Sequence, residues 1–308
     1  MRKVLVITGP TATGKSALGV SLALRLGGEI ISADSMQLYR GLDVGTAKIT
    51  PEEMRGVPHH LLDAAEPGES WSVSRWVDAA AAAAEDIFAR GQVPVIVGGT
   101  NLYIDSLLSG RDFAASGDGA LRAELSAEYD RIGGAAFREK LAEVDPERAS
   151  LLAPADKKRL VRAMEVWRLT GRTITAHDAE TRALPPRWDS LRVALDYAER
   201  ASLYARIDAR VDEMAQRGLF DEARWLLSLP LPPDATALQA IGYKEAAACL
   251  RGECPREAAL EDIRRASRRY AKRQLTWLRR DAEIRWIRWQ GAPDIEAAAE
   301  KVIGWWNQ

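Results

Sequence analysis

Cysteine is scarce in this 308-residue chain, and long apolar runs are absent. The two cysteines, Cys249 and Cys254, are too few for a disulfide framework or a four-ligand zinc site, which favours a reducing compartment. The alanine-rich stretch at residues 79–84 is far shorter than the ~20 residues of a membrane span. The apolar run at the start is too short for a secretory signal. We therefore expect a cytoplasmic protein without a membrane partner.

An excess of charge of one sign is also missing. The 43 basic and 44 acidic residues leave a net charge of -1, so any nucleic-acid affinity must come from local segregation of charge. Histidine is rare as well, and the adjacent His59 and His60 have no Cys or His partner nearby, which favours a structural role over a metal site. With 47% apolar and 28% charged residues, the composition is that of a globular protein.

The motif GPTATGKS at residues 9–16 fills every position of the phosphate-loop pattern G-x-x-x-x-G-K-[ST]. In such a loop, backbone amides and the positive end of the following helix form a cradle for an anion. Lys15 adds a positive charge, and the Ser16 hydroxyl is able to hold a divalent metal. The motif predicts a site for a diphosphate or triphosphate and leaves the reaction open.

Short apolar runs at residues 4–7, 29–32 and 94–97 alternate with longer periodic stretches at 17–26 and 74–90. This alternation predicts βαβ units, and hence an α/β fold with a P-loop NTPase-like parallel sheet flanked by helices. Ligands of such sheets bind beyond the carboxyl ends of the strands. The residues there are Asp34 after the second strand and Gly98, Gly99 and Thr100 after the third.

The pattern becomes entirely helical after a Gly- and Ser-containing bridge at residues 114–119, with breaks at Pro146 and Pro154. We therefore expect residues 114–185 to form a helical insertion domain, and residues 1–113 with 186–308 to form the catalytic core. In the second part of the core, residues 191–196 and 284–289 are strand-like. Residues 202–227 predict a helix broken at Gly218, and residues 294–306 predict a closing helix.

Asp34 is the leading carboxylate near the phosphate loop. Phosphate-loop ATPases and GTPases usually hold magnesium with a carboxylate at the end of an apolar strand. The most apolar strand here is followed instead by Gly98, Gly99 and Thr100. An Asp after a strand is commonly a turn or N-cap residue. The neighbouring Ser35 and Gln37 favour a second interpretation, recognition of a base edge.

A basic helix is predicted at residues 257–280. Helical spacing places Ile263, Ala266, Tyr270 and Trp277 on one face, and Arg264, Arg265, Arg268, Lys272 and Arg279 on the other. A solvated face is the ordinary interpretation, but the lack of acids from residue 263 to 280 favours a surface for the phosphate backbone. A second basic cluster contains Lys157, Lys158, Arg159 and Arg162. Two separate basic surfaces suit a long polyanion.

These residues together resemble the tRNA dimethylallyltransferases, also called tRNA isopentenyltransferases, over nearly the whole chain. The phosphate loop alone occurs in many families, whereas the ordered set of motifs is specific. The set comprises GPTATGKS at 9–16, SADSMQLYRGLDVGTAK at 32–48, PHHLLD at 58–63, VGGTNLY at 97–103, KKRLVRAMEV at 157–166, AIGYKE at 240–245 and KRQLTWLRR at 272–280.

The resemblance implies transfer of a dimethylallyl group from dimethylallyl diphosphate to N6 of the adenosine 3′-adjacent to the anticodon, position 37, in tRNAs that read codons starting with U. It implies that Asp34 is the general base, that Thr100 contacts the substrates near the reacting centre, and that Mg²⁺ binds at Ser16. The implied diphosphate contacts are Gly9, Pro10, Thr11, Ala12, Thr13, Gly14, Lys15 and Ser16. Arg206 and Arg210 match basic positions near the diphosphate, with surface charge as the alternative.

The resemblance also implies tRNA contacts in both predicted domains, a flipped target base and a helical domain that grips the anticodon stem-loop. Lys158 stands where many family members have Gln, which predicts an ionic contact there. We expect a monomer. The implied contacts are Asp34, Ser35, Met36, Gln37, Thr100, Arg122, Lys158, Arg159, Leu160, Val161, Arg162, Gln239, Ala240, Ile241, Gly242, Tyr243, Lys244, Lys272, Arg273, Gln274, Leu275, Thr276, Trp277, Leu278 and Arg279.

Two other classes of function share the phosphate loop. A kinase of a small metabolite would turn over ATP with a small acceptor, and it would give no role to two basic surfaces. An RNA-binding NTPase or switch protein without transferase chemistry would show nucleotide hydrolysis that RNA stimulates. Within the transferase class, free adenylate is an alternative acceptor to tRNA.

Overall fold

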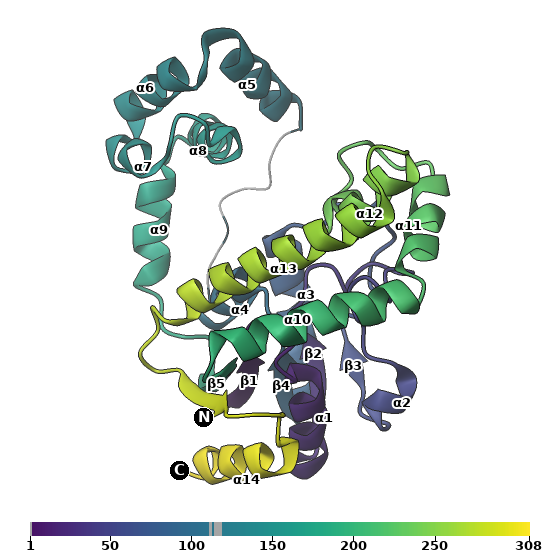
Figure 1. Ribbon diagram of the computed structural model, residues 1–308. Coiled ribbons are helices and arrows are strands. Elements are labelled where there is room, and N and C mark those ends of the chain that lie inside the picture. The colour runs from purple at the N-terminus through teal and green to yellow at the C-terminus, as the bar shows by residue number, and fades with distance from the viewer. Residues whose placement is uncertain (1, 111–112, 114–118) are drawn as a thin grey trace. The chain divides into compact units, whose positions relative to one another are not determined.

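The computed structural model describes residues 2–110, 113 and 119–308 (Figure 1). The chain forms two compact units, residues 1–107 with 188–308 and residues 108–187. The sequence-based division at residues 114 and 185 remains a prediction, and most of the predicted bridge, residues 114–118, lies outside the described residues. Each unit is described separately below.

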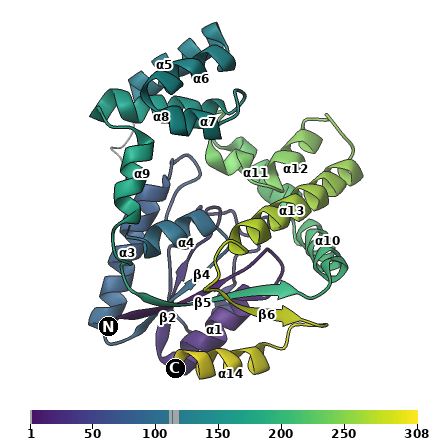
Figure 2. The ribbon, with the colours of Figure 1, turned by 90° about the vertical axis from the view of Figure 1, so that its left-hand side faces the viewer.

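The first unit contains a six-stranded parallel sheet in the order β3-β2-β4-β1-β5-β6 (Figure 2). The register of the central strands pairs Leu5 with Val95 on one side and with Leu191 on the other. The predicted α/β fold with a parallel sheet is confirmed. The strands are β1 (Lys3–Thr8), β2 (Gly28–Ser32), β3 (His59–His60), β4 (Val93–Val97), β5 (Asp189–Tyr197) and β6 (Arg285–Trp289).

Helices cover both faces of this sheet. The helix predicted at residues 202–227 divides into α10 and α11 at Gly218, whose φ of 102° favours glycine. The helices of the first unit are α1 (Lys15–Leu26), α2 (Pro51–Met54), α3 (Val73–Ala89), α4 (Asn101–Leu108), α10 (Arg200–Gln216), α11 (Leu219–Ser228), α12 (Tyr243–Leu250), α13 (Arg256–Leu278) and α14 (Ile295–Trp306), with a short 3₁₀ turn at Thr236–Gln239.

The alternation of side chains along the strands separates two apolar layers. Leu5 and Ile7 of β1, together with Val95 and Val97 of β4, enter the core cluster that includes residues of α1 and α14. Intervening residues such as Ile96 face the other side of the sheet, where α3 packs against β2 and β4. The central strands, buried on both faces, read as continuous apolar runs for this reason.

A separate core cluster lies between the segment after β2 and helices α11, α12 and α13. Tyr39 and Leu42 of that segment pack with Phe220, Tyr243 and Leu260. Each of these side chains is 8% exposed or less. The cluster fixes the segment that carries Asp34 to helices formed almost two hundred residues later in the chain.

The second unit is helical throughout its described elements, as predicted for the insertion. Its core contains Leu125, Phe137, Leu141 and Leu160. Helix α7 begins at Pro146, where a break is predicted, and another break that was not predicted falls at Gly133, with φ of 83°. The helices are α5 (Gly119–Ile132), α6 (Gly134–Val144), α7 (Pro146–Leu151), α8 (Lys157–Thr170) and α9 (Ile174–Arg182).

The adjacent histidines form the short edge strand β3, which the sequence did not predict because two residues carry no periodicity. His60 Nε2 lies 2.6 Å from Glu29 Oε2, and His59 Nδ1 lies 2.8 Å from the Val57 carbonyl oxygen. These contacts support the structural role expected for both rings. In the part of the chain that the structure describes, no helix combines the length and the apolar character needed to span a membrane.

Candidate active site

The phosphate loop, residues 9–16, joins β1 to α1. Gly9 has a φ of 136°, and a Cβ there would lie 2.5 Å from the Leu195 carbonyl oxygen of β5, so this position requires glycine. The Thr13 hydroxyl and the Lys15 ammonium both donate to the Pro10 carbonyl oxygen, at 2.8 and 2.7 Å. The loop thus places a lysine and the free amides of a 12-residue helix around one point, which is an arrangement that binds phosphate.

Gln274 of α13 joins this loop to the end of β4. Its Oε1 accepts a hydrogen bond from the Thr11 amide at 3.2 Å, and its Nε2 donates to the Gly99 carbonyl oxygen at 2.9 Å. The side chain is 5% exposed. The sequence predicts a tRNA contact here, but this side chain instead supports the phosphate loop from inside the protein.

Asp34 closes a turn directly after β2. Its Oδ1 accepts hydrogen bonds from the backbone amides of Met36 and Gln37, at 2.9 and 3.4 Å. This is the turn role that Asp commonly has after a strand. The side chain is partly exposed, so the carboxylate also remains accessible to a substrate. The two interpretations of Asp34 are therefore compatible.

Thr100 and two tyrosines surround this turn. Thr100 Oγ1 accepts a hydrogen bond from the Ser35 amide at 3.1 Å, which joins the end of β4 to the turn after β2. Tyr270 of α13 interacts with Thr100, and burial beside Asp34 raises the pKa of Tyr270 to about 12. Burial, Tyr39 and Asp34 together raise the pKa of Tyr103 to about 12. The sequence predicted no role in the site for Tyr270 or for Tyr103, the last residue of the motif VGGTNLY.

Two cations, Lys15 and Arg210, interact electrostatically with the Asp34 carboxylate. Burial and the charge of Arg210 lower the pKa of Lys15 to about 7, while Asp34 opposes this shift. Burial also lowers the pKa of Arg210, again against Asp34. Arg210 Nη2 donates to the Thr46 carbonyl oxygen at 3.1 Å, while its buried Nε has no hydrogen-bond partner among the residues that the structure describes. Two desolvated cations near one carboxylate favour the binding of a multivalent anion.

Arg206 and Arg210 differ although one helical turn separates them. The Arg206 side chain is 53% exposed and lies 3.6 Å from Glu213. It is therefore a surface residue, and the structure brings Arg210 rather than Arg206 to Lys15 and Asp34. The sequence allowed either a diphosphate contact or a surface charge for each arginine.

A second carboxylate, Asp196, ends β5 beside the phosphate-loop strand. It is 6% exposed, its Oδ1 accepts from the Tyr197 amide at 2.8 Å, and burial raises its pKa. Its Oδ2 lies 3.9 Å from Arg279. Asp196 was not predicted, because a strand-end carboxylate was expected after the most apolar strand, β4, whereas Asp196 lies near the end of β5. The strand-like pattern at residues 191–196 was the available signal.

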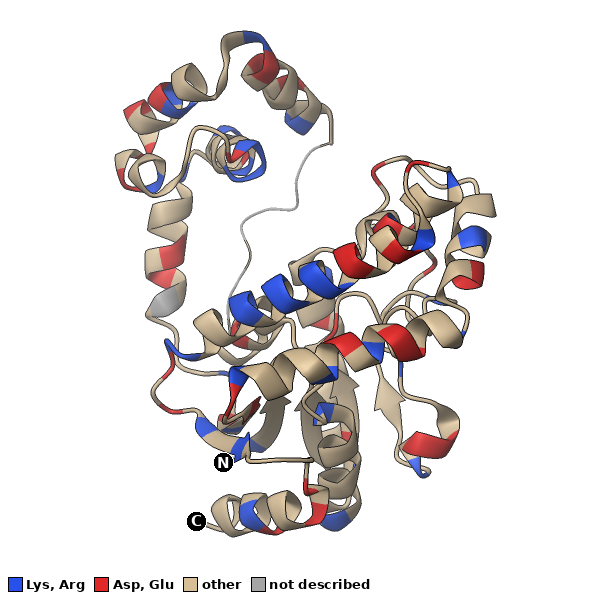
Figure 3. Ribbon diagram, in the orientation of Figure 1, with Lys and Arg blue, Asp and Glu red and all other residues tan. Residues whose placement is uncertain are grey.

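The prediction that the basic face of α13 has no acidic partners is wrong for the first half of the helix. Arg268 lies 2.7 Å from Asp208 of α10, and Arg264 pairs with Asp212 of the same helix. Acidic residues from the preceding turns of α13 add further pairs, including Asp262 with Arg265. Figure 3 shows acidic segments ahead of the basic ones along this helix. A search for acids within residues 263–280 overlooks these partners, because they precede that range or belong to α10.

The buried face of α13 also differs from the predicted one. Trp277 was assigned to the apolar face, but it is 39% exposed and its indole N–H donates to Asp105 at 2.6 Å. The buried side chains of α13 are Ala259, Leu260, Ile263, Ala271, Gln274, Leu275 and Leu278. The buried face of α13 thus lies about one residue further along the sequence than predicted, at 271 and 278 rather than at 270 and 277.

The predicted tRNA-contacting segments contain side chains of two kinds. The first kind is buried and builds the interior of each unit, and contact of these residues with tRNA stays a prediction: Leu160, Val161, Ala240, Gly242, Tyr243, Gln274, Leu275 and Leu278. The second kind is exposed and remains a candidate for contact: Arg122, Lys158, Arg159, Gln239, Lys244, Lys272, Arg273, Thr276, Trp277 and Arg279.

Arg122 and Arg162 have a shared partner within the second unit. Glu165 of α8 is fully buried and accepts two hydrogen bonds from Arg122, both at 3.1 Å. Arg162 Nη1 donates to the same carboxylate at 2.7 Å. The exposed fractions of the two arginine side chains, 53% and 34%, leave part of each guanidinium at the surface.

The predicted magnesium ligand, Ser16, is exposed in the first turn of α1. Within residues 2–110, 113 and 119–308, no group of three or more His, Cys, Asp or Glu side chains could hold a metal ion. Mg²⁺ commonly takes most of its ligands from substrate phosphates and water. An exposed hydroxyl at the mouth of an anion-binding loop fits that type of site.

Comparison with known proteins assigns the chain to a family. The family model described as IPP transferase matches residues 37–281, and the model described as isopentenyl transferase matches residues 2–67. The chain is 48% identical to a tRNA dimethylallyltransferase of Anaeromyxobacter sp. (strain K), over 98% of this chain and 97% of that protein. It is 45% identical to tRNA dimethylallyltransferase 2 of Geotalea uraniireducens, over 92% of each.

Solved structures agree with this assignment. The full-length tRNA isopentenylpyrophosphate transferase of Bacillus halodurans matches with a TM-score of 0.73 and 40% identity, over 99% of this chain and 96% of that chain. A eukaryotic dimethylallyltransferase acting on tRNA matches with a TM-score of 0.86 and 28% identity, over 100% of this chain and 79% of that chain. The chain therefore belongs to the IPP transferase family.

Proposed function

We propose that this protein, as a monomer, transfers a dimethylallyl group from dimethylallyl diphosphate to N6 of adenosine 37, 3′-adjacent to the anticodon, in tRNAs that read codons starting with U. The observation that carries the proposal is that the phosphate loop with Lys15 and the turn with Asp34 both follow strands at the carboxyl edge of the sheet, where the two side chains interact electrostatically. The names of relatives that cover nearly the whole chain support both the donor and the acceptor.

In this mechanism, the loop at residues 9–16 binds the diphosphate through its amides. The allylic C–O bond breaks, the N6–C bond forms, and the diphosphate leaves with the bonding electrons. Lys15 and Arg210 stabilise the negative charge that develops on the leaving group, and their buried position strengthens that effect. Asp34 orients the exocyclic amine and accepts its proton, and Thr100 fixes the turn that carries Asp34.

The Ser16 hydroxyl would hold Mg²⁺ beside the diphosphate, and the ion supplies further neutralisation of its charge when bound. Lys15 would remain the cation inside the loop, since its amine already lies 2.7 Å from the Pro10 carbonyl oxygen. The residues therefore suit a diphosphate leaving group without requiring ATP.

Incubation with labelled dimethylallyl diphosphate, Mg²⁺ and unmodified tRNA tests this function. We expect the label in tRNA and stoichiometric release of diphosphate. Label in free adenylate but not in tRNA would replace the proposed acceptor. Turnover of ATP with a small acceptor and no prenyl transfer would instead support a phosphate-loop kinase.

Lys272 and Arg264 are expected to differ in tRNA binding although both lie on α13. Lys272 is exposed, whereas Arg264 is 17% exposed and pairs with Asp212, Glu257 and Glu261. Lys272→Ala should weaken tRNA binding and flatten its dependence on log salt by up to about one unit for a lost phosphate contact. Arg264→Ala should leave that slope unchanged. Equal slopes for Lys272→Ala and the unmodified protein would exclude the contact.

A further inference from the structure

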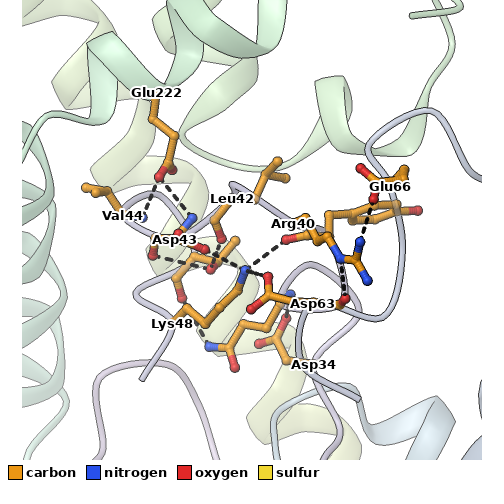
Figure 4. Close-up of polar contacts among 12 residues, drawn as sticks. Asp34, Arg40, Leu42, Asp43, Val44, Lys48, Asp63, Glu66 and Glu222 are labelled. Carbon is orange, nitrogen blue, oxygen red and sulfur yellow. Dashed lines mark hydrogen bonds and ion pairs between the residues drawn. The ribbon is translucent and has the colours of Figure 1, made fainter. Parts of the chain in front are cut away.

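The turn at residues 43–48 binds a carboxylate from α11. The backbone amides of Asp43 and Val44 donate to Glu222 Oε2 at 2.9 and 2.8 Å, and the Gly45 amide donates to Oε1 at 3.0 Å (Figure 4). Three successive amides directed at one anion form a strong anion-binding turn. Glu222 therefore fixes the backbone of this turn from outside the segment that contains it.

Tyr243 of α12 holds the same carboxylate. Its hydroxyl donates to Glu222 Oε1, and burial together with Glu222 raises the pKa of Tyr243, which keeps it a donor. The ring also packs on the turn, because a Cβ at Gly45 would lie 2.6 Å from it. The residue is 1% exposed. The bonds to Glu222 thus come from two elements that the core cluster already brings together.

The opposite side of this turn contacts the candidate active site. The Thr46 carbonyl oxygen accepts from Arg210 Nη2 at 3.1 Å and from Gln37 Nε2 at 3.3 Å, and the Ala47 carbonyl oxygen lies 3.5 Å from the same nitrogen of Gln37. Gln37 is also in the turn whose amides bind Asp34. The carbonyl groups of residues 46 and 47 therefore hold two residues that flank Asp34.

The end of the turn has an independent anchor in Lys48. Its ammonium is 5% exposed and lies 2.6 Å from both Asp43 and Asp63 and 2.8 Å from the Tyr39 carbonyl oxygen (Figure 4). Loss of Glu222 would thus free the amides of residues 43–45, while Lys48, which pairs with Asp43, still holds the two ends of the turn together. The expected result is a shift of the carbonyl groups between these anchors rather than unfolding of the segment.

We propose that Glu222, held by Tyr243, is a positioning residue that sets the place of Arg210 and Gln37 through the turn at residues 43–48. This inference rests on the proposed function and deepens it. It makes residues of α11 and α12 responsible for the positions of the side chains that bind the diphosphate and the adenine. Glu222 touches neither substrate in this account. Its effect on the reaction is indirect, through Arg210 and the turn that holds Asp34.

Glu222→Gln tests the proposal, with Asp221→Asn as the matched control. Gln keeps the size of Glu but offers one oxygen, so it directs an N–H₂ group at backbone donors. Asp221 is adjacent on α11, and its side chain is 79% exposed. We expect Glu222→Gln to lower kcat/KM for dimethylallyl diphosphate by about 10- to 100-fold, the size of loss that a misplacement of ~1 Å produces. Asp221→Asn should stay within about twofold of the unmodified protein.

Binding of inorganic diphosphate provides a readout that a merely structural role would not change. Because the Thr46 carbonyl oxygen holds Arg210, a shift of that carbonyl group in Glu222→Gln should weaken the binding of inorganic diphosphate by about tenfold or more, the usual cost of a lost charged contact. Tyr243→Phe keeps the packed ring and should give a smaller loss of affinity, even if Glu222→Gln folds poorly. Unchanged diphosphate affinity in both variants would overturn the inference. Absence of prenyl transfer by the unmodified protein, with diphosphate still bound, would instead overturn the proposed function.

Discussion

Asp34→Asn is expected to lower kcat for prenyl transfer by about 100- to 10,000-fold, which is the usual contribution of a general base. Asn retains the Oδ1 atom that accepts from the amides of Met36 and Gln37, so the turn should persist while the base is lost. The effect should appear in single-turnover measurements of the transfer step. Binding of tRNA should change by less than about tenfold, because a catalytic base acts mainly in the transition state.

Two comparisons make this prediction specific. Asp34→Ala removes both the base and the oxygen that accepts from the turn amides. Any further loss of kcat relative to Asp34→Asn therefore measures the contribution of the turn. Glu66→Gln is a control for the loss of a carboxylate elsewhere in the segment after β2, since the Glu66 side chain is 60% exposed and pairs with Arg40. A kcat for Asp34→Asn equal to that of the unmodified protein would remove Asp34 from the mechanism.

Diphosphate affinity is expected to fall as the pH rises above about 7. The free site holds Lys15 with a pKa of about 7, because burial and Arg210 disfavour its charged form. A bound diphosphate favours the ammonium and raises that pKa, so binding takes up a proton. The affinity should decrease by up to about tenfold per pH unit between the pKa of the free and the bound state. Below pH 7, Lys15 is protonated before binding and this dependence disappears.

Lys15→Met separates this effect from the protons that diphosphate itself gains or loses. Met has a similar length but no titrating amine, so its pH profile reports the ligand alone. Calorimetric titration with inorganic diphosphate from pH 6 to pH 9 should show the steeper decline only in the unmodified protein. Equal slopes in both proteins would contradict the role of Lys15 as the titrating cation.

The strands and the phosphate loop could be predicted because their signals are local. Residues 4–7 and 94–97 are continuous apolar runs, as strands buried on both faces require, and Gly9 occupies a position where only glycine fits. The carboxyl-edge rule then predicted a site at Asp34 and Thr100, and the structure joins Thr100 to the turn after β2 through the Ser35 amide. Family resemblance added the order of the motifs across the whole chain.

The remaining parts of the site depend on contacts between distant elements. Glu222 and Arg210 belong to helices whose sequences look like ordinary amphipathic surfaces, and only folding brings them to the turn at residues 43–48. The ion pairs of Arg264 and Arg268 with α10 were hidden for the same reason. A burial pattern can locate the inner face of a helix, but it does not reveal which charged partner the neighbouring helix provides.

The most direct test of the central claim is nucleoside analysis of a tRNA that reads a codon starting with U, after reaction with dimethylallyl diphosphate and Mg²⁺. A second tRNA, identical except that guanosine replaces adenosine 37, serves as the matched acceptor. We predict N6-dimethylallyladenosine in the first tRNA, located next to the anticodon, and no modified nucleoside in the second. Equal prenylation of both tRNAs, or none in either, would contradict the account.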